Sequence, residues 1–233
     1  MLKTHIDYSV VRTNRRKTAS VNILFDKVIV TVPKKLSNQQ IQQIVFEKRK
    51  WIINKLNSNK NKSKHANEKR FRDGEFFTYL GRRYGLKIKK NSSKNVKLIK
   101  GKLVVFYPLK KNKPASEMNV RLCLVEWYKK NAQRILEHKT YQYAKLFSGQ
   151  PKRISIKDYR SRWGSCNSTG NISFNWRIII APSKIIDYLV VHELAHIIHH
   201  NHSSKYWKLV NFIYPDYKEC RSWLKNYSHN LYF

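Results

Sequence analysis

Acidic residues are scarce in this chain. Its 233 residues include 14 Asp and Glu but 48 Lys and Arg, which gives a formal net charge of +34 at pH 7. A protein with so large an excess of positive charge attracts polyanions, so nucleic acid and anionic substrates are candidate partners. Compositional drift is the alternative explanation, although drift of this kind would not by itself remove acidic residues.

Cysteines are few and long apolar runs are missing. The three cysteines, Cys123, Cys166 and Cys220, lie far apart and form no C-x-x-C pair. This spacing argues against a disulfide framework and is typical of reduced intracellular thiols. No stretch approaches the about 18 apolar residues of a membrane span, and the N-terminal residues lack the apolar core of a signal peptide. We therefore expect a cytoplasmic protein without a membrane partner.

Histidines, by contrast, are concentrated in one place, since five of the nine lie within residues 192–202. His192, Glu193 and His196 follow the order H-E-x-x-H, and the apolar residues around them recur at helical spacing. On a helix the two histidines share one face and can reach a single metal ion; a core helix with incidental histidines is the alternative. We predict Glu193 as the general base toward a metal-activated water, because a purely structural zinc site would be closed by four protein ligands.

The third metal ligand has to come from beyond this helix. His202 follows His192 by ten residues and would lie about 15 Å further along a continuous helix. It can join the site only if the helix ends first and the chain turns back, and Asn201 suits the left-handed conformation of such a turn. We predict His202 as the third ligand, with His199 and His200 as competitors near the metal or in solvent.

The chain divides into two halves of different pattern. Residues 1–115 are basic and rich in predicted strands, with one helix from Ser37 to about Leu56 and polar linkers at 57–70 and 109–116. Residues 116–233 are predicted to be mainly helical, with a strand at 171–180 directly before the metal-binding helix. The fold class is therefore α+β, and we place the domain boundary between residues 115 and 116.

The residues around the predicted strand at 171–180 bear on the substrate. In zinc peptidases an edge strand beside the metal-binding helix pairs with extended substrate, which favours a peptide. Arginines surround the strand, and guanidinium groups bind phosphates well, which favours a nucleotide. A solvated basic face is the alternative for the arginines. Asn175 could bind a substrate backbone or orient a loop. The candidate substrate-binding residues are Arg160, Arg162, Asn175 and Arg177.

Several motifs carry a family resemblance. Residues 160–207 contain R-W-G-S-C, N-I-S-F-N-W, D-Y-L-V-V-H-E-L-A-H and N-H-S-x-x-[FY]-W. The N-terminal half contributes V-P-x-x-L-S, R-K-W-I and D-G-E-x-F-x-Y-L-G-R-R-Y. Over nearly its whole length the chain resembles the YgjP-like metal-dependent hydrolases, relatives of the SprT and WLM metalloproteases. At position 206 it carries Tyr where we expect Phe, an exchange that we predict to be mild.

The resemblance implies that the β-rich N-terminal half is followed by a compact zincin-like domain of the minimal gluzincin, SprT-like type. It implies zinc held by His192, His196 and His202, with Glu193 as general base. Family members are described mainly as metallopeptidases, and one branch as a nucleoside triphosphate pyrophosphatase acting on UTP.

Three functions therefore remain open. We favour a zinc-dependent metallopeptidase; the alternatives are a metal-dependent nucleotide pyrophosphatase and a nucleic-acid-binding protein with a structural metal site. For non-specific binding of nucleic acid, we expect the β-rich half and the basic segment 48–72 to carry most of the affinity.

Overall fold

The computed structural model describes residues 6–14, 18–24, 27–63, 69–108 and 116–233, without the side chains of residues 24 and 58–63. Contacts between Cα atoms divide the chain into two compact units, Met1–Asn67 and Glu68–Phe233. This division differs from the predicted boundary between residues 115 and 116. The physical reason is that the strands after residue 75 pack on the long helix that follows them, so they belong with the C-terminal unit.

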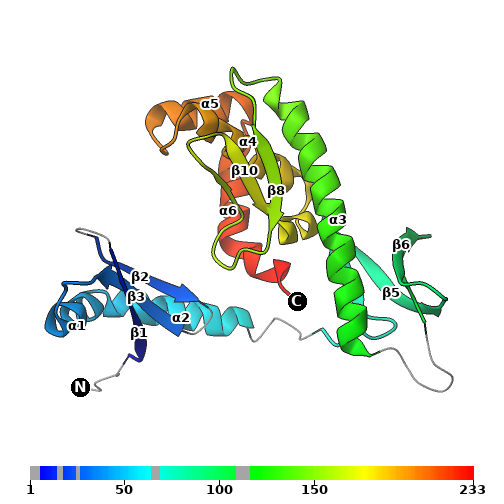
Figure 1. The fold of residues 1–233 in the computed structure, drawn as a ribbon, viewed down its shortest axis with the longest axis horizontal. Helices are drawn as coiled ribbons and strands as arrows, with labels where there is room; N and C mark the ends of the chain where they lie inside the picture. Colours follow the sequence, from blue (N-terminus) through cyan, green and yellow to red (C-terminus); the bar gives the residue numbers. More distant parts are fainter. Residues whose placement is uncertain (1–5, 15–17, 25–26, 64–68, 109–115) are drawn as a thin grey trace. The chain divides into compact units, whose positions relative to one another are not determined.

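The N-terminal unit is a small sheet covered by two helices. Strands β1 (Tyr8–Thr13), β2 (Ser20–Leu24) and β3 (Lys27–Pro33) form it in the order β1-β3-β2, with β1 parallel and β2 antiparallel to β3. Helices α1 (Asn38–Glu47) and α2 (Arg49–Ser63) follow (Figure 1). Alternate residues of β3 point inward, which builds a core with the apolar sides of the two helices. This core consists of Val21, Val28, Val30, Val32, Ile41, Val45 and Ile52.

The predicted helix from Ser37 to about Leu56 is two helices. Its start is confirmed: the Ser37 hydroxyl accepts from the Gln40 amide at 3.2 Å, and the Gln40 side chain accepts from the Ser37 amide at 3.0 Å. The first helix ends at Glu47, with Lys48 as its C-cap, and α2 then runs to Ser63, into the segment predicted as a linker. Polar composition alone predicted that linker, yet residues 57–63 contain no Pro or Gly to stop a helix.

The C-terminal unit begins with a four-stranded sheet. Strands β4 (Phe76–Tyr79), β5 (Arg82–Lys90), β6 (Asn95–Ile99) and β7 (Lys102–Tyr107) lie in the order β4-β5-β7-β6. Both hairpins turn through two residues with positive φ, Leu80 and Gly81 in one and Lys100 and Gly101 in the other. Such turns match the twist of the flanking strands.

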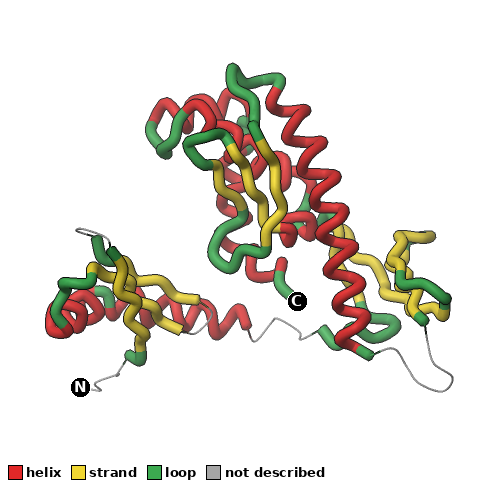
Figure 2. The backbone as a smooth tube through the Cα atoms, viewed as in Figure 1, coloured by secondary structure: helices red, strands yellow, loops and turns green. Residues whose placement is uncertain are grey.

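Helix α3 (Glu117–Ala144) joins this sheet to the rest of the unit. Its buried residues recur at every fourth position from Val120 to Ala144, so one stripe of the helix faces the core. The helix contacts β6 and β7 as well as strand β8 (Arg153–Lys157) (Figure 2).

A second, three-stranded sheet lies beside α3. It comprises β8, β9 (Gly164–Cys166) and β10 (Asn171–Asn175) in the order β8-β10-β9. The predicted strand at 171–180 therefore stops at Asn175, where the Asn175 side chain accepts from the Arg177 amide and starts a 3₁₀ helix, η1 (Trp176–Ile180). The strand is also central instead of at an edge, because β9 pairs with its other side.

Helices α4 (Ser183–Ile198), α5 (Ser204–Ile213) and α6 (Tyr217–Tyr227) and the 3₁₀ helix η2 (Ser228–Leu231) complete the unit. The described part of the chain is thus a mixed α/β protein with six α-helices and three small sheets. None of its described helices has the length and apolar character needed to cross a membrane.

Candidate metal centre

Helix α4 carries the H-E-x-x-H residues at the centre of the fold. Nine of its residues are buried, so it is a core helix as the apolar spacing predicted. An ion pair at 2.5 Å between Asp187 and Lys139 ties its first half to α3. Glu193 is buried, and His192 and His196 are partly buried on the same helix. The helix therefore offers both imidazoles from a rigid support.

The chain turns back directly after α4. The helix ends at Ile198, and His199 caps it in an extended conformation, with φ −126° and ψ 102°. Asn201 does not take the predicted left-handed conformation, since the described non-glycine residues with positive φ are Phe71, Leu80 and Lys100. An extended residue at the end of the helix is sufficient to reverse the chain, and α5 starts at Ser204.

The reversal brings His202 to the two histidines of α4. One ring nitrogen from each of His192, His196 and His202 lies within 4.8 Å of the others. The Nε2 atoms of His192 and His202 are 3.3 Å apart. Two nitrogens bound to one tetrahedral zinc ion at 2.0–2.1 Å would be separated by about 3.4 Å. The spacing of this pair matches ligation to one zinc ion, and the His196 nitrogen lies close enough to be the third ligand of the same ion.

Hydrogen bonds at the opposite ring nitrogens hold two of these imidazoles. The Nδ1 atom of His192 donates to the Tyr206 hydroxyl at 2.7 Å, and that hydroxyl donates to the His192 carbonyl at 2.9 Å. His196 Nδ1 donates to the His199 carbonyl at 3.1 Å. In both rings Nε2 is then left without a proton and free to bind a metal.

The surroundings keep the three histidines neutral. Burial, together with the positive charges of His196, His202 and Arg221, lowers the pKa of His192 to about 3. Burial is also the main cause that lowers the pKa of His196 and of His202. Neutral imidazoles are the form that binds metal ions.

Glu193 lies beneath strand β9 and is 3% exposed. A Cβ atom on Gly164 would come within 2.4 Å of the Glu193 Oε1 atom, so only glycine leaves room for this carboxylate. Burial raises the pKa of Glu193 to about 8, while the charge of Arg162 lowers it. A cation bound nearby would lower this pKa further and favour the ionised form.

The predicted substrate-binding residues differ in their positions. Arg162 is exposed and close enough to Glu193 to affect its charge. Arg177, in contrast, forms an ion pair with Asp158 and lies 4.4 Å from the Trp176 ring centroid, which indicates a structural role. Asn175 is fully buried and donates to the carbonyls of Tyr159 and Arg162, at 2.8 and 3.3 Å, so it orients the loop before β9.

The remaining candidates lie outside the triad. Arg160 is exposed, and its carbonyl accepts from the Tyr232 hydroxyl at 3.5 Å. Cys166 is partly buried, and burial raises the pKa of its thiol to about 11, which disfavours the thiolate that a metal would need. His200 is exposed.

Two contributors to the centre were missed from the sequence. The motifs mark position 206 only as an exchange for Phe, whereas the structure shows the Tyr206 hydroxyl bonded to both His192 Nδ1 and the His192 carbonyl. The prediction that the exchange is mild is tested below. Gly164 gave a signal only as part of R-W-G-S-C, and its contact with Glu193 spans 29 residues of sequence. Contacts across such distances depend on the tertiary fold.

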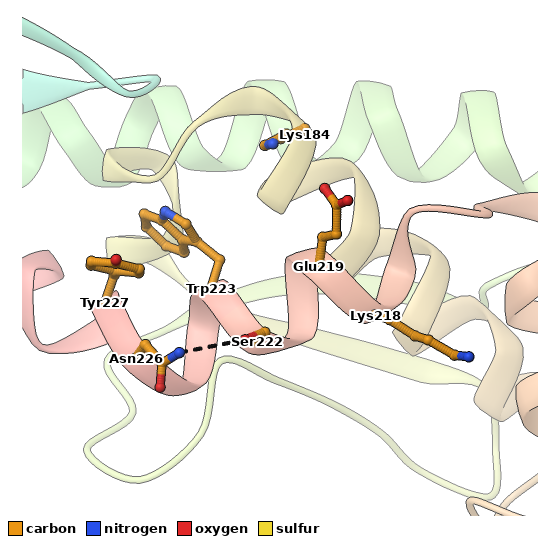
Figure 3. Close-up of a pocket in the computed structure, with 7 residues that line it drawn as sticks. All are labelled: Lys184, Lys218, Glu219, Ser222, Trp223, Asn226 and Tyr227. Atoms are coloured by element: carbon orange, nitrogen blue, oxygen red, sulfur yellow. Dashed lines mark hydrogen bonds between the residues drawn. The ribbon is translucent and has the colours of Figure 1, made fainter.

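Two surface hollows lie along α6, one bordered also by α4 and the other by α5. One of about 580 Å³ is lined by Lys184, Lys218, Glu219, Ser222, Trp223, Asn226 and Tyr227, and contains no histidine of the triad (Figure 3). The other, of about 490 Å³, is lined by Ser204, Trp207, Lys208, Asn211, Tyr217, Lys218 and Arg221. Trp207 connects the second hollow to the triad, because its ring stacks on His202 with centroids 5.5 Å apart.

Comparison with known proteins supports the resemblance seen in the sequence. The family model described as "YgjP-like, metallopeptidase domain" matches residues 17–227. The chain belongs to the YgjP-like family. Membership in this family, together with three histidines that can hold a metal ion, supports a metal-dependent hydrolase. No curated protein and no solved structure matches the chain significantly.

Replacing Tyr206 with Phe should weaken zinc binding by about 10- to 100-fold, because His192 Nδ1 loses the partner that fixes its tautomer and orientation. Zinc affinity is measured by competition with a chromophoric chelator. Tyr214→Phe is the matched control, since it removes a tyrosine hydroxyl that donates to the Lys184 carbonyl instead. Equal affinities of the two variants would show that the hydroxyl does not orient the ligand.

Replacing Gly164 with Ala should lower the free energy of unfolding by about 1–3 kcal/mol, because the new methyl group overlaps the buried Glu193 carboxylate. Urea titration measures this change. Gly85→Ala serves as control, since a Cβ atom there meets its nearest neighbour at 4.0 Å. If both variants unfold at the same urea concentration, β9 can shift to accommodate the methyl group, and the contact with Glu193 does not require glycine at position 164.

Proposed function

We propose that this protein is a zinc-dependent metallopeptidase in which His192, His196 and His202 hold the metal and Glu193 acts as general base. The observation that carries the proposal is the convergence of three imidazole nitrogens within 4.8 Å, on and next to a helix that also bears a buried glutamate. A structural site would need a fourth protein ligand, and the metal-binding group among the described residues contains three.

A bound zinc ion supplies Lewis-acid chemistry, which lowers the pKa of water and polarises a substrate carbonyl. The protein contributes the other parts. Glu193 accepts a proton from the attacking water and passes it to the leaving amine. Its burial suits this task, because a desolvated carboxylate is a stronger base than an exposed one. Tyr206 and the His199 carbonyl keep the ligand nitrogens free of protons.

Strand β9 is the element best placed to hold a peptide. It is an edge strand of the sheet β8-β10-β9 and contacts α4. Gly164 on this strand lies against Glu193. An extended peptide that adds to the free edge of β9 would therefore run past the general base, with its main chain bound by strand pairing. This assigns to β9 the role that the sequence suggested for residues 171–180.

A nucleotide pyrophosphatase is the second candidate, and one observation favours it. The hollow beside Trp207 is lined by Lys208, Lys218 and Arg221, with no acidic side chain among its lining residues. Arg221 lies 4.8 Å from the Trp207 ring centroid, and Trp207 stacks on His202. A phosphate group would be attracted to this hollow while the rest of the substrate reaches the triad.

A substrate panel separates the two candidates and tests the role of Glu193. Zinc-loaded protein should cleave an unfolded protein, and Glu193→Gln should bind zinc normally but lose at least about 100-fold in rate, because the water has no proton acceptor. The measurements are peptide release, nucleotide turnover and zinc content. Turnover of nucleoside triphosphates alone would replace the peptidase by the pyrophosphatase. Wild-type rates in the Gln variant would remove Glu193 from the mechanism.

The histidines can be tested without a substrate. His202→Ala should weaken zinc binding by at least about 100-fold, whereas His200→Ala should leave it within about threefold, since His200 lies outside the triad. Dialysis followed by metal analysis gives both values. Small and equal losses would mean that another residue provides the third ligand.

A further inference from the structure

One face of the four-stranded sheet packs on α3, and most side chains described on its other face are exposed. Phe77, Leu86, Leu103 and Val105 point toward α3 and are buried. Successive side chains of a strand point to opposite faces of the sheet. The residues between these buried ones therefore point away from α3, and the pairing register brings them together on that face. We call this side the outer face. It carries Phe76, Thr78, Arg83, Gly85, Lys87, Lys89, Asn95, Lys97, Ile99, Lys102, Val104 and Phe106.

Cations and apolar groups alternate across the outer face. Val104 stands opposite Lys87 on one neighbouring strand and Lys97 on the other. It is only 4% exposed, and the aliphatic stems of its long lysine neighbours are of the kind that can cover such a residue. In the next row Phe106 stands between Lys89 and Asn95. The ammonium groups are thereby held at the surface around an apolar strip.

An aromatic ring lies at one edge of this strip. Phe76 on edge strand β4 is 50% exposed, and its ring rests over Gly85, where a Cβ atom would be 4.0 Å from its Cε1 atom. The Arg83 guanidinium carbon lies 4.8 Å from the ring centroid. The ring is thus supported from the sheet and flanked by a cation, while the rest of it faces solvent.

Few carboxylates balance these charges. Lys87 pairs with Asp73 at 2.8 Å. In the described part of the chain, Arg83, Lys89, Lys97 and Lys102 form no ion pair within 4.0 Å. Of these four, Lys102 lies close enough to Asp73 to lower the pKa of that carboxyl, which itself pairs with Lys87. The outer face therefore presents a clear excess of positive charge around Phe76 and Phe106.

We propose that the outer face binds single-stranded nucleic acid, with a base stacked on Phe76 and phosphates held by Lys89, Lys97 and Lys102. Single strands are bound by this combination of a cationic track and exposed aromatic rings. A duplex keeps its bases inside and cannot use Phe76 in this way. The surface is separate from the metal centre, so the inference does not depend on the peptidase or the pyrophosphatase.

The outer face also refines the expectation for segment 48–72. Arg49 stacks on Phe46 at 4.2 Å, and Arg72 pairs with Glu117 at 2.6 Å, so both have protein partners. The side chains of Lys60, Lys62 and Lys64 lie outside the described residues. The outer face lies within the β-rich residues 1–115, where we expected most of the affinity.

The test measures binding by fluorescence anisotropy, with labelled oligo-dT and oligo-rU of about 15 nucleotides and with a duplex of equal length. The triple variant K89Q/K97Q/K102Q should bind both single strands at least about 20-fold more weakly. The slope of log affinity against log salt should also fall by about 2, since each phosphate contributes about 0.7 in single strands. The variant K130Q/K145Q/K205Q removes three exposed lysines outside the sheet and should lose less than about threefold. Comparing the two oligonucleotides tells whether DNA or RNA is preferred.

Stacking is tested separately from charge. Phe76→Ala should weaken binding of single strands by about 5- to 10-fold without changing the salt slope. Phe212→Ala is the control, because Phe212 is exposed on α5, away from the sheet. Circular dichroism confirms that each variant is folded.

Three outcomes would overturn the proposal. The first is an equal loss of affinity in the two lysine variants, which would show that the net charge of the protein, and not the outer face, attracts the oligonucleotide. The second is a duplex bound as tightly as the single strands. The third is no binding of oligonucleotides at low salt, including the case in which vesicles with phosphatidylserine are bound instead.

Discussion

The hydroxyl of Tyr206 is the contact on which the candidate centre depends. It receives a hydrogen bond from the His192 ring and donates one to the His192 main chain, so a single group joins α5 to α4. Because α5 is fixed in this way, the short connection before it is fixed as well, and His202 reaches the two histidines of α4. The adjacent Trp207, stacked on His202, is positioned by the same link.

The carboxylate of the centre is positioned by a different route. The Glu193 side chain extends from α4 toward strand β9, where Gly164 leaves space for the carboxylate. Strand β9 is in turn paired to β10, and Asn175 at the end of β10 holds the loop before β9 through two carbonyl groups. The histidines are thus organised by α5 and the glutamate by the small sheet. The two parts meet on one buried helix.

The large positive charge has several uses in the molecule. Arg12 donates to the carbonyls of Lys34 and Leu36 and to the Asn38 side chain, and so fastens β1 to the start of α1. Arg177 is enclosed by Asp158 and two aromatic rings. These guanidinium groups serve in structural contacts because their fork matches several acceptors at once. Lys89, Lys97 and Lys102 of the outer face form no ion pair among the described residues and remain open to an external anion.

The sequence by itself determined the local features of this protein. The helical spacing of apolar residues predicted α4, the H-E-x-x-H order placed two histidines on one face, and Ser37 marked a helix start, because each depends on residues within one or two turns. The motifs also indicated the YgjP-like family, which the match over residues 17–227 confirms. The sequence also predicted that His202 lies near the other two histidines, because the chain can turn back to them once the helix ends before His202.

Only the tertiary structure decided the rest. The contacts of Tyr206 with His192 and of Gly164 with Glu193 join different elements, and no local pattern encodes them. Likewise, β10 became a central strand because β9 pairs with it, and the division of the chain moved to residues 67 and 68 because α3 packs on the strands before it. Arginines that looked equivalent in sequence differ in the structure, since Arg177 is partly buried while Arg160 and Arg162 are exposed. Packing decides which side chains are surrounded by protein, and this depends on parts of the chain that are distant in sequence.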